Sequence, residues 1–180
     1  MLFRSLATEL MARFPKLESA RVSKNFPHGI SVTTQERKPA GIWCLSGKER
    51  CFYFDKNGVA FSATQFSSGF LVLNVLDYRP RELKLGSVVA ESNWLINISR
   101  TRDLLAGADI NISEFVILPN SFDEFYAKTA EGWRILFSNQ TNVESQTNAL
   151  AIFLKEKISP AQRASLQYVD LRIQDRIYYK

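Results

Sequence analysis

The chain has 180 residues, of which 46% are hydrophobic and 23% are charged. This balance is typical of a folded protein with a buried core, arranged as one domain or two small ones. The 23 basic residues outnumber the 18 acidic ones and give a net charge of +5, which suits nucleic acid, an anionic membrane surface or simple solubility. The basic residues are scattered, with one modest cluster at Arg79, Arg81 and Lys84. We therefore favour a solvated surface.

The sequence shows neither a membrane span nor an export signal. No apolar run approaches the ~20 residues that a membrane-spanning helix needs. Residues 1–6 lack the charged, apolar and cleavage regions of a signal peptide. The sequence by itself therefore predicts a chain that neither spans a membrane nor directs its own export.

The first 39 residues predict a helix followed by a β-hairpin. Residues 2–14 place apolar side chains on one helical stripe, which ends before Pro15. Alternating apolar and polar residues then predict two strands, over residues 20–26 and 30–35. His28, the only histidine, lies between a proline and a glycine in the turn that joins them. We interpret this histidine as a turn residue rather than a catalytic one.

A boundary is expected at residues 37–39, where Arg-Lys-Pro breaks the second strand. The smaller module would then span residues 1–39 and a larger unit residues 40–180. In the larger unit, Asn57-Gly58 favours a tight turn between two strands. The expected strands are 40–45, 51–54, 59–63, 70–76, 115–118, 125–129 and 133–137, the expected helices are 89–105 and 142–158, and residues 166–179 would close the chain as a hairpin or a bent strand.

Cys44 and Cys51 flank a polar, glycine-containing segment that predicts a hairpin turn. If the two strands pair in register, the cysteines face each other closely enough for a cross-strand disulfide in an oxidising compartment. Two buried free thiols are the alternative. We expect no zinc site, because tetrahedral binding needs four ligands and the chain has one histidine.

We find no constellation that indicates catalysis. A serine or cysteine nucleophile needs a base within hydrogen-bond reach, and the single histidine is placed in a turn. The glycines stand singly rather than clustered ahead of a helix, so no nucleotide motif is present. We therefore expect a non-enzymatic protein without a cofactor or metal. A basic, nucleic-acid-binding α+β domain is the alternative, because aromatic residues make up 12% of the chain and bases stack on such side chains.

Three stretches of the sequence resemble the motifs of one known protein family. Residues 15–39 contain P-K-L-E-S-A-R-V-S-K-N-F-P and, after a strand, E-R-K-P; residues 55–61 read D-K-N-G-V-A-F, and residues 168–172 read Y-V-D-L-R. In this order and spacing they resemble the FtsQ/DivIB family of bacterial cell-division proteins. They match the latter half of its POTRA module, the start of its β domain and its terminal strand. Phe26 replaces a usual tryptophan, and residues 62–165 match only as a strand-and-helix pattern.

The resemblance implies an α+β fold with a partial POTRA module, a helix plus a β-hairpin, at residues 1–39. A mixed-strand β domain with two flanking helices would follow at residues 40–180. It also implies a non-enzymatic divisome scaffold on the extracytoplasmic side of the membrane at the division septum. The chain would be an N-terminally truncated piece of a protein whose full length carries a membrane anchor.

In such a scaffold the C-terminal strand pairs with an FtsB-like protein in complex with an FtsL-like protein. We expect the contact strand within residues 166–179, because an exposed strand edge accepts a partner strand. Tyr168 and Ile177 could instead complete the core, and Arg172 could pair with a neighbouring aspartate on the surface. The residues expected to touch the partner are Tyr168, Arg172, Ile177, Tyr178 and Tyr179.

Overall fold

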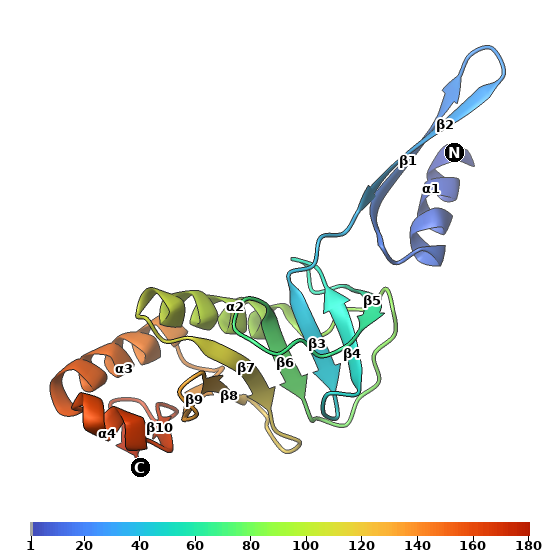
Figure 1. Cartoon of the computed structure of the whole chain (residues 1–180). Coiled ribbons are helices and arrows are strands. Elements are labelled where there is room, and N and C mark those ends of the chain that lie inside the picture. The colour runs from blue at the N-terminus through green and yellow to red at the C-terminus, as the bar shows by residue number, and fades with distance from the viewer. Residues whose placement is uncertain (1) are drawn as a thin grey trace.

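The computed structural model describes the backbone of residues 2–180 and the side chains of residues 5–180. Within this range the chain forms a two-stranded sheet and a nine-stranded sheet, with helices before and between the strands. Figure 1 shows the two-stranded sheet as a ribbon that projects from one end of the molecule, while the C-terminus lies towards the other end. The predicted α+β fold class is confirmed.

The N-terminal unit consists of α1 (Leu2–Arg13), β1 (Leu17–Asn25) and β2 (Gly29–Glu36). The helix and the hairpin predicted for this part of the chain are both present. The strands pair antiparallel with Val22 opposite Val32, and α1 packs along β1. Towards the turn of the hairpin the apolar side chains are exposed to solvent: Phe26 is 85% exposed and Ile30 is 64% exposed.

The larger unit is built on one mixed sheet with the strand order β11-β10-β9-β8-β7-β6-β3-β4-β5. Strands β3, β6 and β7 run parallel to one another, β9 and β10 are also parallel, and the other neighbours are antiparallel. The strands are β3 (Gly41–Leu45), β4 (Arg50–Phe54), β5 (Ala60–Thr64), β6 (Leu73–Asp77), β7 (Ile112–Ile117), β8 (Glu124–Thr129), β9 (Arg134–Ser138), β10 (Tyr168–Asp170) and β11 (Tyr178–Tyr179).

Strand β6 begins later than the predicted residue 70. The side-chain amide of Asn74 donates hydrogen bonds to the backbone carbonyls of Ser67 and Val72, at 2.8 and 3.2 Å. These bonds fold the preceding segment into a loop on the sheet, in which Leu71 is 90% exposed. Apolar composition predicted a strand here, but the buried amide determines where the strand starts.

Two helices flank the large sheet, close to where the sequence predicted them. They are α2 (Ser92–Gly107) and α3 (Val143–Lys157). Their buried residues, including Trp94 and Leu150, share one core cluster with alternate residues of the strands, such as Trp43 and Phe125. The remaining strand residues form the opposite face, where a second apolar cluster contains Ile42, Cys44, Cys51, Leu76 and Val116.

A short helix, α4 (Pro160–Ser165), follows α3 and was not predicted. The side chain of Ser159 accepts a hydrogen bond from the backbone of Gln162, whose side chain in turn accepts from the backbone of Ser159. This reciprocal capping, with Pro160 at the first helical position, starts a helix that has no buried residue. A six-residue helix without an apolar stripe has no periodicity by which the sequence could reveal it.

Candidate protein-binding edge

The C-terminal end of the chain forms one edge of the large sheet. Strand β10 lies between β9 and β11, and β11 is the outermost strand. Lys180 and Tyr168 exchange both backbone hydrogen bonds, at 3.2 and 3.3 Å. In an antiparallel pair the bonding direction alternates, so the N–H and C=O of Tyr179 point away from β10. The edge therefore presents backbone groups to which another strand can pair.

The structure divides the predicted contact segment into two short strands and a connection at residues 171–177. Tyr178 and Tyr179 lie on the outer strand and are 45% and 52% exposed. Tyr179 shares the helix-covered face with α3, where its ring centroid lies 4.9 Å from that of Phe153. Tyr178 pairs with Asp170 and so lies on the opposite face. A strand added here would meet one tyrosine on each face.

Two other predicted contact residues are partly enclosed. Tyr168 is half-buried on β10, whose two neighbours already pair with its backbone. Ile177 is half-buried and packs against the main core cluster. The structure thus brings Tyr178 and Tyr179 together at the edge and places Tyr168 and Ile177 behind them.

The guanidinium of Arg172 is held within the chain. Its Nε and Nη2 donate to the two carboxylate oxygens of Asp170 at 2.9 and 2.7 Å, and its Nη1 donates to Glu124 at 2.6 Å. Burial raises the pKa of Asp170, but the hydrogen bonds and charge of Arg172 outweigh burial and hold that pKa below its ordinary value. Arg172 therefore fixes the start of the connection at residues 171–177, because its side chain is bonded to Glu124 of β8 and Asp170 of β10.

The lowered pKa of Asp170 predicts how the C-terminal segment responds to acid. A carboxyl with a lower pKa in the folded state stabilises the fold above its unfolded pKa of about 3.9, and this contribution is lost as the pH falls through the folded-state pKa. We expect the backbone amide NMR signals of residues 171–180 to be unchanged from neutral pH to about pH 5 and to lose dispersion below about pH 4.

The control for this prediction is Asp170→Asn, which should weaken the order of the segment at neutral pH and remove most of its acid response. A hydrogen bond from Arg163 lowers the pKa of Glu131 as well, so Glu131 also contributes to the loss of stability in acid. The NMR signals of residues 171–180 separate the effect of Asp170 from that of Glu131, because they report on the C-terminal segment alone. If residues 171–180 show an equally large acid transition in the Asp170→Asn variant and in the unaltered chain, Asp170 is not the group that causes it.

A groove of about 820 Å³ lies beside the edge, between α3 and the connection at residues 171–177. Its apolar lining includes Ile152 and Ile173, which are 58% and 53% exposed, and Phe153, the ring neighbour of Tyr179. Sequence reasoning missed this groove. The available signal was the isoleucine at position 152, a large apolar residue that lies outside the apolar stripe of the predicted helix.

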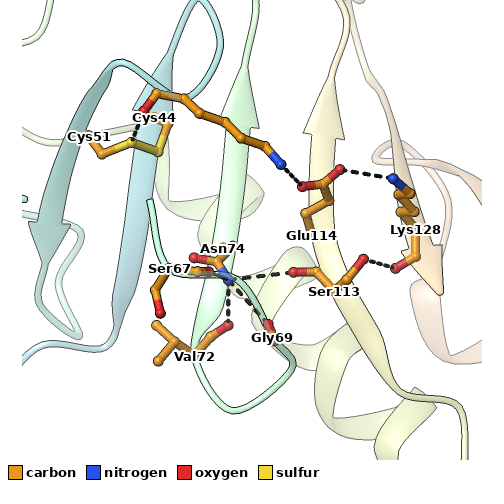
Figure 2. Close-up of polar contacts among 10 residues, drawn as sticks. Cys44, Cys51, Ser67, Gly69, Val72, Asn74, Ser113, Glu114 and Lys128 are labelled. Atoms are coloured by element: carbon orange, nitrogen blue, oxygen red, sulfur yellow. Dashed lines mark hydrogen bonds and ion pairs between the residues drawn. A yellow bond between two sulfur atoms is a disulfide. The ribbon is translucent and has the colours of Figure 1, made fainter. Parts of the chain in front are cut away.

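A second cluster of polar contacts lies on the opposite face (Figure 2). Cys44 and Cys51 face each other across β3 and β4 with their Cα atoms 4.0 Å apart, and the structure joins them in a disulfide. Both are buried, at 0% and 2% exposure. Nearby, Glu114 forms ion pairs with Lys48 at 3.1 Å and Lys128 at 3.7 Å. A buried disulfide has no free thiolate, so the two cysteines can hold the strands together but offer no thiolate nucleophile.

Among the residues whose side chains the structure describes, no group of three or more His, Cys, Asp or Glu could hold a metal ion. None of the helices in the described range is both long and apolar enough to cross a membrane. A scan against protein-family models finds no match, and a search of curated proteins finds none either. The sequence motifs and the C-terminal edge of the large sheet are therefore the features that indicate a function.

Proposed function

We propose that the chain is a non-enzymatic scaffold of the bacterial divisome, and that its C-terminal edge strand pairs with an FtsB-like protein in complex with an FtsL-like protein. The observation that supports this most directly is the outermost strand β11, where the backbone N–H and C=O of Tyr179 point outward. The choice of partner is supported by the resemblance of residues 15–39, 55–61 and 168–172 to motifs of the FtsQ/DivIB family.

Strand addition explains how such a surface can bind a partner both tightly and selectively. The backbone bonds of an added strand supply affinity, while its side chains alternate between the two faces and supply specificity. On one face an added side chain would lie beside Tyr178, and on the other beside Tyr179 and Phe153. The adjoining groove can accept further apolar side chains of the same partner, because its lining residues Ile152 and Ile173 are exposed.

The proposed place of action is the extracytoplasmic side of the membrane at the division septum, with a membrane anchor in the full-length protein. The paired cysteines support this placement. Disulfides persist in oxidising compartments and are rare in the reducing cytosol. The positions of Cys44 and Cys51, opposite each other on neighbouring strands, need no rearrangement to form one.

The charges on the opposite face favour a protein partner over nucleic acid. Lys48 and Lys128 share the carboxylate of Glu114, and Arg172 is held by Asp170. Nucleic-acid binding draws its affinity from cations that neutralise phosphates. Cations that are already paired with carboxylates contribute less to such binding.

The test is binding of the chain to the extracytoplasmic part of a cognate FtsB-like protein, measured by isothermal titration calorimetry. Tyr179→Pro removes the outward N–H and should weaken binding at least about tenfold. Tyr179→Ala is the matched control, because it removes the ring and keeps the N–H, and its loss should be smaller. A Tyr178→Lys, Tyr179→Lys variant places charge on both faces and should also lose binding.

Two outcomes would contradict the proposal. Absence of binding by the unaltered chain would remove the scaffold mechanism, and equal binding by the unaltered chain and Tyr179→Pro would remove strand addition. A parallel titration with single-stranded nucleic acid tests the alternative function, which requires an affinity that falls steeply with salt. Circular dichroism of each variant confirms that the sheet remains folded.

A further inference from the structure

Arg37 stands at the junction of the two units and is fixed to the N-terminal one. Its backbone N–H donates to the carbonyl of Lys16 at 2.8 Å, and its side-chain Nε donates to the carbonyl of Pro15 at 3.0 Å. Both acceptors lie in the turn between α1 and β1. The side chain is 16% exposed, so the guanidinium is held in a largely buried position at the base of the N-terminal unit.

On the side of the large sheet, Asp55 is held in the same way as Arg37, by backbone groups of its own unit. It follows β4 directly, and its side chain is 3% exposed. Its Oδ1 accepts hydrogen bonds from the backbone N–H groups of Asn57 and Val59, both at 2.9 Å, and so organises the turn between β4 and β5. Gly58 in this turn has a φ of 76°, which a glycine adopts without strain. The carboxylate is therefore as firmly held as the guanidinium.

The two groups meet across the junction. Arg37 Nη1 donates to Asp55 Oδ2 at 2.5 Å. Each ion has its remaining bonds within its own unit, so this contact joins two preorganised parts. Breaking a buried pair leaves an uncompensated charge, which makes separation of the partners costly.

A second ion pair at the junction differs in its surroundings. Lys56 Nζ lies 3.2 Å from Glu18 Oε1, but the lysine side chain is 76% exposed. Exposed pairs contribute little to stability and are screened by salt. This pair therefore offers a matched control, because it also links the two units but has little power to hold them in one orientation.

We propose that the Arg37–Asp55 pair is a joint that fixes the orientation of the N-terminal unit relative to the nine-stranded sheet. The linker alone would not do this. Ala40 is already tied to the large sheet, since its backbone N–H donates to the carbonyl of Phe54 at 2.8 Å, but Lys38 is exposed and backbone rotation there can turn one unit against the other. The N-terminal unit and the C-terminal edge lie towards opposite ends of the molecule (Figure 1). The joint thus sets the angle at which the molecule presents these two ends, whatever partners they bind.

The experiment measures the distance between a spin label on each unit by double electron–electron resonance. His28→Cys in the hairpin turn and Asn120→Cys between β7 and β8 provide exposed attachment sites, while the disulfide leaves the native cysteines unlabelled. The labelled chain should give one narrow distance distribution. Arg37→Met, which keeps an apolar stem of similar length, should broaden that distribution about twofold or more. Lys56→Gln should leave it unchanged.

Asp55→Asn provides a second route to the same result. The amide oxygen can still accept the bonds from Asn57 and Val59, while the charge that attracts Arg37 is gone. Near-ultraviolet circular dichroism separates loss of the joint from loss of the fold, because it reports the packing of buried tryptophans such as Trp43. The inference is overturned if the distribution is already broad in the unaltered labelled chain, or if it stays narrow in both Arg37→Met and a folded Asp55→Asn variant.

Discussion

Replacing Phe125 by alanine should lower the free energy of unfolding by about 3–5 kcal/mol, the largest effect of any single substitution considered for this chain. The ring is 3% exposed and lies at the centre of an aromatic cluster. Its centroid is 6.2 Å from that of Trp94, 6.1 Å from that of Phe115 and 5.3 Å from that of Phe137. The substitution removes these contacts and leaves a cavity between the sheet and α2, where surrounding side chains can collapse only in part.

Phe122 supplies the matched control, since it is the same residue type three positions earlier and is 91% exposed. Phe122→Ala should change the free energy of unfolding by no more than about 0.5 kcal/mol. Urea denaturation followed by tryptophan fluorescence measures both variants. Equal losses in the two variants would contradict the placement of Phe125 at the centre of the core.

Removing the cysteine pair should have the second largest effect. A disulfide that closes a loop of this short length is expected to contribute about 2–3 kcal/mol, chiefly by restricting the unfolded chain. A Cys44→Ala, Cys51→Ala variant should therefore unfold at a lower urea concentration than the oxidised chain. Because the two residues are 0% and 2% exposed, a mild reductant should act on the folded protein far more slowly than on the unfolded one.

A thiol count on the unfolded chain, with and without reductant, decides between the two interpretations of the cysteines. The disulfide requires that thiols react only after reduction. If both thiols react in protein that has been oxidised and never reduced, the two residues are buried free thiols. In that case the support that the cysteines lend to an extracytoplasmic location is lost as well.

Parts of the candidate site could be predicted from sequence. Ile177, Tyr178 and Tyr179 form a short apolar and aromatic run after Gln174-Asp175, and such a run is a local property that a short segment displays by itself. The role of Arg172 could not be predicted in the same way. Its partner Glu124 is 48 positions away, and no local pattern shows that a distant carboxylate will hold the guanidinium.

The sequence by itself determined the helix and hairpin at the start, the two helices that flank the large sheet, most of the strands and the facing positions of Cys44 and Cys51. Each of these depends on periodicity, on a turn signal or on a strand break that lies within a few residues. These are the features for which near neighbours in the chain are also near neighbours in space.

Only the tertiary structure decided the parallel pairing of β3, β6 and β7, the groove beside α3, and the contact between Arg37 and Asp55. Parallel neighbours require long connections, so their partners are chosen by packing across the whole sheet and not by adjacent residues. A groove and a buried ion pair likewise arise only where separate elements meet. Local patterns specify which segments become strands and helices, but the free energy of burying their shared surfaces selects which of them touch.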